Sequence, residues 1–333
     1  MKSVALILLA VSAPAQTWIS HSSGSKASLR GVSAVTSHVV WASGSAGTVL
    51  LSLDAGASWR SLPVPDSGQL DFRDVEAFDR HTAYVLAIGP GEKSRIYKTT
   101  DGGAHWTLQL TNPDPAGFLD AFAFWDETSG IAFGDTVNGE FEILTTGDGG
   151  AHWSRQHAPP ALRSEGAFAA SGTSIVTLGP NHCWFATGGE GAARVYRSAD
   201  RGRTWRVVNT PIRKDAASAG IFSLDFRDAL HGVAAGGEYK KPNESAHVVA
   251  VTSDGGKTWR EPRGNGPAGY RSAVVYDPKR RAWIAVGPSG SDISTDDGES
   301  WRRLDGAGYN ALSVSKDGSL WAVGADGRIA EYR

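Results

Sequence analysis

The pattern Ser/Thr-x-Asp-x-Gly-x-x-Trp, which occurs six times, constrains the fold of this chain more than any other feature. Its copies end at Trp59, Trp106, Trp153, Trp205, Trp259 and Trp301, so consecutive copies lie 42 to 54 residues apart. A repeat of this length is typical of one four-stranded blade of a β-propeller. The 41 glycines among 333 residues also favour many short strands joined by tight turns. The sequence therefore predicts an all-β propeller.

Each copy of the pattern is interpreted as the turn between the third and fourth strands of its blade. The Ser or Thr hydroxyl and the Asp carboxylate can accept hydrogen bonds from turn amides, and the Gly permits a positive φ. The Trp can pack back across the neighbouring blades. The six aspartates are therefore predicted to hold turns and not to take part in chemistry.

Two further features of the repeat each occur seven times and therefore predict seven blades. A hydrophobic strand that ends in glycine precedes each copy and recurs once more at residues 319–324. An innermost strand begins seven times, at Leu29, Phe72, Phe118, Ser164, Gly220, Tyr270 and Tyr309.

The seventh blade lacks a fourth strand of its own. The chain stops after the expected third strand, residues 328–333, whereas residues 17–20 belong to no other blade. Thr17-Trp18 matches the Thr-Trp that ends two copies of the pattern, at positions 204–205 and 258–259. We therefore expect the N-terminal strand to complete the seventh blade and to close the ring, which removes exposed sheet edges.

The first residues of the chain predict export. Lys2 precedes an apolar run, residues 4–11, and Ala13-Pro14-Ala15 has the small-x-small pattern that signal peptidase cleaves. We expect a signal peptide at residues 1–15, one propeller domain at residues 16–333, and a periplasmic or secreted location. The apolar run is far shorter than the roughly 20 residues that span a bilayer, so no membrane span is expected.

Composition narrows the classes of partner and cofactor. The 33 Lys and Arg against 35 Asp and Glu give a net charge of −2, which argues against nucleic acid as the main partner. Cys183 is the single cysteine, so no intramolecular disulfide can form. The nine histidines show no metal-ligand spacing, and the sequence predicts neither a metal nor a cofactor.

With these repeats the sequence resembles the Asp-box (BNR) propellers, and within them the photosystem II stability and assembly factor-like family. The resemblance rests on the six boxes, on the strand starts at residues 29–32 and 72–75, and on the segment at residues 165–172. It implies an exported, non-enzymatic propeller that binds a protein or peptide partner. In the photosynthetic members the propeller is a chaperone-like binder of a reaction-centre subunit, with an arginine-rich patch near the channel.

The candidate binding residues share one face of the expected propeller. In a blade, the start of the innermost strand and the loop between the second and third strands lie on one face, and the boxes lie on the other. The candidates at the strand starts are Arg30, Arg73, Asp74, Asp120, Glu165, Tyr270, Arg271 and Asn310. Those in the loops are Glu190, Glu238 and Tyr239. Mixed charge and aromatic rings at a channel mouth suit a binding site; the alternative is that they line a water-filled channel and pair with one another.

The second candidate function is a glycan-acting enzyme or lectin on the same face. Sialidase chemistry needs three arginines around a carboxylate, a tyrosine nucleophile and an acidic partner. Arg30, Arg73, Arg271, Tyr270 and Glu165 supply these types, but the Phe/Tyr-Arg-Ile-Pro signature of sialidases is absent. Tyr270 and Arg271 are also neighbours, so in one strand they would point to opposite faces. Convergence of the three arginines beside Tyr270 would favour the enzyme.

Overall fold

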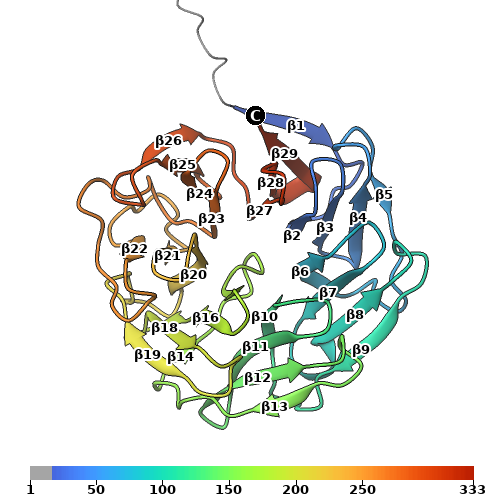
Figure 1. Ribbon diagram of the computed structural model, residues 1–333, viewed down its shortest axis with the longest axis horizontal. Coiled ribbons are helices and arrows are strands. Elements are labelled where there is room, and N and C mark those ends of the chain that lie inside the picture. Colours follow the sequence, from blue (N-terminus) through green and yellow to red (C-terminus); the bar gives the residue numbers. More distant parts are fainter. Residues whose placement is uncertain (1–16) are drawn as a thin grey trace, which may run out of the picture.

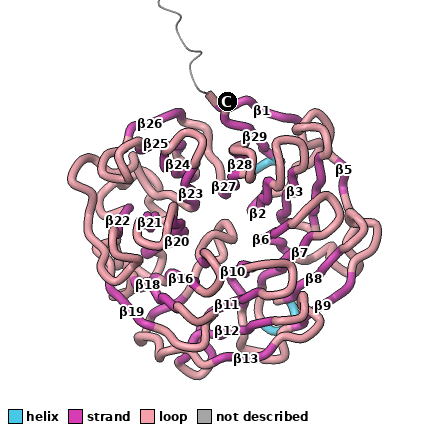
Figure 2. The backbone as a smooth tube through the Cα atoms, viewed as in Figure 1, coloured by secondary structure: helices cyan, strands magenta, loops and turns pink. Residues whose placement is uncertain are grey.

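The computed structural model describes residues 17–333, and the expected signal peptide at residues 1–15 lies outside them. Seven sheets surround a central channel, as Figure 1 shows. The described residues contain two one-turn 3₁₀ segments, η1 (Gly91–Lys93) and η2 (Ala325–Gly327), and otherwise only strands and loops (Figure 2). None of the described helical segments could cross a membrane. The predicted all-β, seven-bladed propeller is confirmed.

The strands of the first four blades run from the channel outwards. Blade one has β2 (Leu29–Ala34), β3 (Val40–Gly44), β4 (Thr48–Ser52) and β5 (Arg60–Ser61). Blade two has β6 (Asp71–Ala77), β7 (Ala83–Ile88), β8 (Arg95–Thr99) and β9 (Thr107–Thr111). Blade three has β10 (Leu119–Phe124), β11 (Gly130–Val137), β12 (Glu140–Thr146) and β13 (Ser154–Gln156). Blade four has β15 (Ile175–Leu178), β16 (His182–Ala186), β18 (Arg194–Ser198) and β19 (Arg206–Asn209).

The last three blades follow the same order. Blade five has β20 (Ala219–Phe226), β21 (Gly232–Glu238) and β22 (Val249–Thr252), with an isolated bridge between Val251 and Arg260 where a fourth strand would lie. Blade six has β23 (Ala273–Asp277), β24 (Ala282–Gly287), β25 (Gly290–Ser294) and β26 (Arg302–Asp305). Blade seven has β27 (Ala311–Val314), β28 (Leu320–Val323), β29 (Arg328–Tyr332) and, outermost, β1 (Trp18–Ser22).

The N-terminal strand closes the ring, as predicted. β1 pairs antiparallel with β29 in a register that runs from Trp18 opposite Tyr332 to Ser22 opposite Arg328. The Trp18 indole also reaches the next blade, where its Nε1 donates to the hydroxyl of Ser291 at 3.0 Å. Because both ends of the chain share one sheet, the ring cannot open without breaking this pairing.

The six Asp-containing turns lie at the outer hairpins, and the turn of blade three also contacts a neighbouring blade. In blade three, the Thr146 hydroxyl accepts a hydrogen bond from the Gly150 amide at 2.9 Å and donates to Asp148 at 2.9 Å. The hydroxyl of Tyr84, from blade two, donates to the Gly149 carbonyl at 2.7 Å. Backbone and side-chain hydrogen bonds from His152 lower the pKa of Asp148 to about 2, so its carboxylate stays charged while it holds the turn.

Blade four departs from the predicted strand pattern. The innermost strand was expected to start at Ser164, but β14 (Glu165–Gly166) is only two residues long and pairs with β17 (Gly188–Gly189), beside blade five. The true inner strand, β15, begins at Ile175. The prediction was wrong because blade four carries an insertion: residues 164 to 188 span what residues 29 to 44 span in blade one. Residues 167–174, which lie between β14 and β15, form a loop that projects towards the centre of the ring, and we call it the channel loop (Figure 1).

Candidate functional site

In four of the seven blades, a β-bulge near the start of the inner strand leaves one residue unpaired at the end of the channel. In blade one, Leu29 pairs with Gly44 and Gly31 with Ser43, so Arg30 is the extra residue. The same shift leaves Arg73 as the extra residue in β6, Asp120 in β10 and Phe222 in β20. A bulge bends the strand and redirects its unpaired residue. The inner strands therefore present a ring of side chains at one end of the channel.

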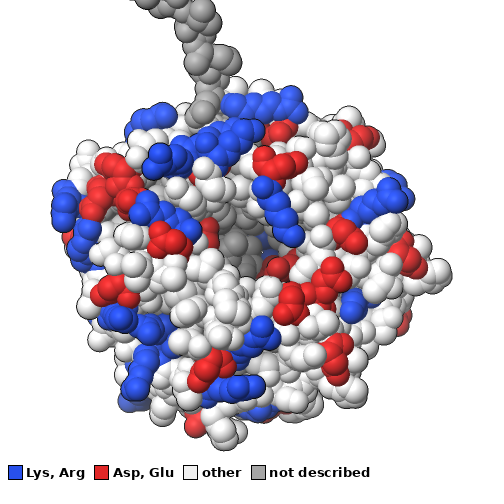
Figure 3. All heavy atoms as spheres, viewed as in Figure 1, with Lys and Arg blue, Asp and Glu red and all other residues white. Residues whose placement is uncertain are grey.

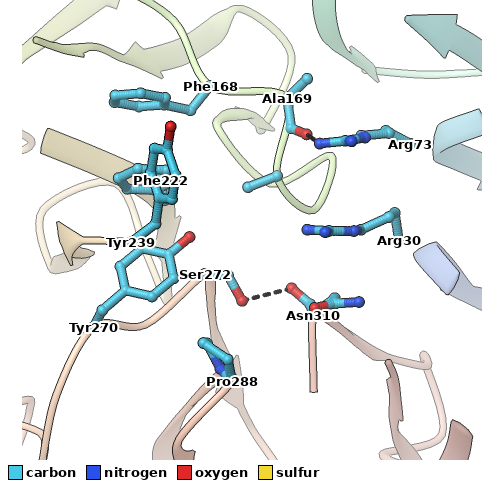
Figure 4. Close-up of a pocket in the computed structure, with 11 residues that line it drawn as sticks. Arg30, Arg73, Phe168, Ala169, Phe222, Tyr239, Tyr270, Ser272, Pro288 and Asn310 are labelled. Carbon is cyan, nitrogen blue, oxygen red and sulfur yellow. Dashed lines mark hydrogen bonds between the residues drawn. The ribbon is translucent and has the colours of Figure 1, made fainter. Parts of the chain in front are cut away.

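Part of this ring encloses a cavity of about 430 Å³, the mouth cavity. Its lining residues are Arg30, Arg73, Phe168, Ala169, Ala170, Phe222, Tyr239, Tyr270, Ser272, Pro288 and Asn310. Figure 4 shows that the two arginines approach from one side and the four aromatic side chains from the other. The cavity therefore has a cationic wall and an aromatic wall.

The two arginines of the cationic wall differ in how they are held. Arg73 donates from Nε to Asp71 at 2.8 Å and from NH1 to the Ala169 carbonyl at 2.8 Å. Arg30 forms no hydrogen bond or ion pair with residues 17–333, and its Nε is buried without a partner. Burial, and then the positive charge of Arg73, lower the pKa of Arg30. The Asp71 carboxylate lies near both arginines but pairs with Arg73. A half-buried guanidinium that forms no ion pair of its own beside a second one can accept an anion with two oxygens, such as a carboxylate.

The aromatic wall is a packed cluster centred on Phe222. Its ring stacks on Phe168, with centroids 4.0 Å apart and planes 12° apart, and meets the Tyr270 ring edge-on at 4.8 Å. Tyr239 packs against the same ring and is 46% exposed. Burial raises the pKa of the Tyr270 hydroxyl, so the phenol stays neutral beside Arg30.

The channel loop forms the floor of the mouth cavity. Its Ser171 hydroxyl donates to the Ser272 carbonyl at 2.8 Å, and its Thr173 carbonyl accepts from the Leu224 amide at 2.9 Å. The loop is therefore fixed to blades five and six. Residues 168–170 line the mouth cavity, whereas residues 171–173 line a second cavity of about 340 Å³ farther along the channel.

The second cavity is lined by three carboxyl groups, of which Asp74 is buried and Glu76 and Asp225 are partly buried. Burial raises the pKa of Glu76 to about 8, of Asp74 to about 7 and of Asp225 to about 6. The Asp74 carboxylate accepts the Phe122 amide at 3.0 Å, and Asp225 accepts the Tyr276 amide at 2.8 Å. These groups tie neighbouring inner strands together. Among residues 17–333, no group of three or more His, Cys, Asp or Glu side chains could hold a metal ion.

The structure brings five of the predicted binding residues together in the mouth cavity: Arg30, Arg73, Tyr239, Tyr270 and Asn310. Asp74 faces the second cavity instead. Asp120 is buried near Arg73, and its Oδ2 has no hydrogen-bond partner among the described residues. Burial, followed by the nearby charge of Asp135, raises the pKa of Asp120 well above its ordinary value.

Four predicted residues lie elsewhere. Arg271 is fully buried and paired with Asp292, because it follows Tyr270 and so points away from the channel. Glu165 is buried in a pair with Arg194, Glu238 accepts the Ser218 hydroxyl inside the blade, and Glu190 is exposed on a loop. The three arginines Arg30, Arg73 and Arg271 therefore do not converge on one point.

Sequence reasoning found Tyr239 and Tyr270 but missed Phe168 and Phe222, the two phenylalanines of the aromatic wall. In the sequence, Phe168 and Phe222 cannot be told from core residues. A register shift turns Phe222 towards the channel, and the insertion in blade four places Phe168 there. The length of blade four was the one available signal. No aspartate or glutamate is among the described residues that line the mouth cavity, so the only charged side chains in its lining are those of Arg30 and Arg73.

The face seen in Figure 3 carries charged side chains of both signs around the central hollow. In Figure 3, positive and negative side chains are interspersed over the visible face, with Lys and Arg gathered along the rim over β26, β29 and β1. Mixed charge of this kind favours solubility and gives little long-range steering.

Comparison with known proteins gives relatives of low identity. No protein-family model matches the chain. It is 26% identical over 286 residues to the photosystem II assembly lipoprotein Ycf48 of Synechococcus sp. (strain CC9902), covering 83% of this chain and 75% of the relative. A solved structure described as YCF48 bound to D1 peptide superposes with a TM-score of 0.66 at 16% identity, covering 95% of this chain and 96% of that one. The streptogramin B lyase structure has a TM-score of 0.67 at 14% identity, covering 96% and 97%. The structural matches show the fold, and the sequence match makes this a propeller similar to a photosystem II assembly factor.

Proposed function

We propose that this protein is an exported, non-enzymatic propeller that binds a segment of a protein partner in the mouth cavity and assists the assembly of that partner. The observation that carries the proposal is the Arg30 guanidinium, which has no partner among residues 17–333 and lies beside Arg73. An uncompensated charge in a partly buried cavity is costly, and a bound carboxylate removes that cost.

The relatives support a peptide as the class of ligand. The relative from Synechococcus is named an assembly lipoprotein, and the YCF48 structure holds a D1 peptide. Those names describe those proteins. For this chain they favour an acidic peptide segment over a small metabolite, and the name lipoprotein agrees with export to the periplasm or beyond.

The lining of the mouth cavity supports binding over glycoside hydrolysis. A retaining or inverting glycosidase needs at least one carboxylic acid that reaches the substrate. The described lining contains none, and Glu165, the expected acid, is buried against Arg194. The streptogramin B lyase match shows that this fold can carry an enzyme, so the fold alone does not argue either way.

Site-specific photo-crosslinking in the producing cells tests the proposal. A benzoylphenylalanine in place of Tyr239 at the mouth cavity should crosslink a defined partner, and mass spectrometry should map the crosslink to an acidic segment of an exported protein. The matched control places the same group at Leu230, which is 51% exposed between β20 and β21, at the opposite end of the inner strand. Equal crosslinking from both positions, or none from position 239, would contradict the proposal.

A further inference from the structure

The mouth cavity offers more than an anion site. A carboxylate between Arg30 and Arg73 fills a small part of about 430 Å³, since a group the size of a water takes about 30 Å³. The remaining space faces the rings of Phe222, Tyr239 and Tyr270 (Figure 4). Apolar surface at a cavity gains free energy only when a ligand covers it.

The aromatic wall is also held in place before any ligand arrives. Phe222 is fixed by stacking on Phe168 and by the edge of Tyr270, and both Phe222 and Tyr270 are at most 5% exposed. Tyr239, which is 46% exposed, is the ring with area still to cover. A rigid wall lowers the entropy cost of binding an apolar side chain.

The channel loop limits how a ligand can enter. Residues 168–170 of the channel loop form the floor, and the loop is tied to blade two through Ala169 and to blades five and six through Ser171 and Thr173. A chain therefore does not thread through the channel at this point. A ligand must enter and leave by the same opening. Its carboxylate and its apolar group must therefore lie close together, on the same residue or on adjacent residues.

We infer that the mouth cavity selects a peptide segment in which a carboxylate lies beside an aromatic or other large apolar side chain. The carboxylate occupies the cationic wall and the apolar side chain covers Tyr239 and its neighbours. This inference rests on the proposed binding site and adds the chemistry that the site selects. The carboxylate can be a chain terminus or an acidic side chain, and both have the same chemistry here.

Isothermal titration calorimetry of the full chain with short acetylated peptides tests the inference. The probes are acetyl-Ala-Gly-Phe and acetyl-Ala-Gly-Ala with free carboxylates, acetyl-Ala-Gly-Phe amide, and acetyl-Ala-Asp-Phe amide. We expect a carboxylate-bearing Phe peptide to bind at least tenfold more tightly than the Ala peptide, or about 1.4 kcal/mol. We expect the Phe amide without a carboxylate to lose most of its affinity. Comparing the free terminus with the Asp peptide identifies the source of the carboxylate.

Variants separate selectivity from folding. Tyr239→Ala should weaken binding of the Phe peptide much more than binding of the Ala peptide, and Tyr239→Phe should retain the preference for Phe. Leu108→Ala, at an equally exposed position on β9, is the matched control and should change nothing. Arg30→Gln should weaken binding of all three peptides that carry a carboxylate.

The outcomes distinguish failure of the paired recognition from failure of the proposed anion site. Equal affinity of the Phe and Ala peptides, both dependent on Arg30, would overturn the inference and leave the proposed anion site standing. Binding of the Phe amide as tightly as the free acid would overturn the paired recognition. Failure of every carboxylate peptide to bind would overturn the proposed site as well.

Discussion

The indole ring of Trp18 and the phenol ring of Tyr332 lie 5.0 Å apart between centroids, although they come from opposite ends of the described chain. Trp18 is 9% exposed and also contacts the Tyr309 ring at 5.0 Å. The residue therefore joins β1 to blade seven and, through Ser291, to blade six. Trp18 therefore helps to keep the ring closed, because it holds the N-terminal strand against the last two blades.

Replacing Trp18 with alanine should therefore destabilise the whole propeller. Removing a buried aromatic side chain costs about 3–5 kcal/mol of unfolding free energy. Ile19→Ala is the matched control, because Ile19 lies on the same strand and is 38% exposed. Urea unfolding monitored by circular dichroism measures both. Similar losses for the two variants would mean that the closure rests on β1 backbone pairing and not on the indole.

The channel loop gives a test of backbone geometry. Gly172 has φ of +74°, and an added Cβ would lie 2.2 Å from the Asp74 Oδ1 atom. Gly179 also has a positive φ, +57°, but nothing lies within 4 Å of its Cβ position. Gly172→Ala should lower the free energy of unfolding by about 1–3 kcal/mol more than Gly179→Ala does. Both alanines would adopt the unfavourable left-handed backbone, but only the Cβ at position 172 would clash. Equal melting temperatures for the two variants would mean that the channel loop can shift away from Asp74 without loss of stability.

The raised pKa values of the carboxyl groups that line the second cavity predict how the free energy of unfolding depends on pH. The pKa of Glu76 is raised to about 8 by burial and then by Asp74, whereas in the unfolded chain it lies near 4. Between these values the folded state holds a proton that the unfolded state releases, so the free energy of unfolding falls as pH rises from about 4 to about 8. Glu76→Gln should flatten this fall.

Denaturant unfolding between pH 5 and 8.5 measures the effect. This range avoids the turn aspartates Asp101 and Asp148, whose pKa values are about 2 and whose stabilisation is lost only in stronger acid. Glu140→Gln, at an exposed position on β12, should keep the wild-type slope. A Glu76→Gln slope equal to that of wild type would show that Glu76 is charged throughout.

The sequence predicted those parts of the molecule that depend on local, repeated patterns. The blade count and the pairing of residues 17–20 with the last blade follow from the period and from unmatched strands at the two ends. The cationic wall could also be predicted from the sequence, because Arg30 and Arg73 lie at equivalent positions near the start of consecutive inner strands.

The rest of the site depends on register and insertion, which the repeat does not encode. A shift of one residue decides whether Tyr270 or Arg271 faces the channel, and a strand of alternating residues is compatible with either. The channel loop replaces the start of an inner strand in blade four, so Phe168 reaches the cavity by a path that no other blade shares. Glu165 and Glu238 look available in the sequence, but they are neutralised or hydrogen-bonded inside the blades.

The central claim is that Arg30 and Arg73 capture a carboxylate of a partner, and charge reversal tests it most directly. Crosslinking from position 239 should be measured in the protein that carries Arg30→Glu with Arg73→Glu, and in a control with Arg60→Glu and Arg206→Glu, two exposed arginines outside the channel. Both proteins have the same net charge. The account predicts that the first pair lowers the crosslink yield at least tenfold, that the control pair leaves it unchanged, and that both keep a melting temperature near that of the parent. A yield that survives reversal of Arg30 and Arg73 in a folded protein would contradict the account.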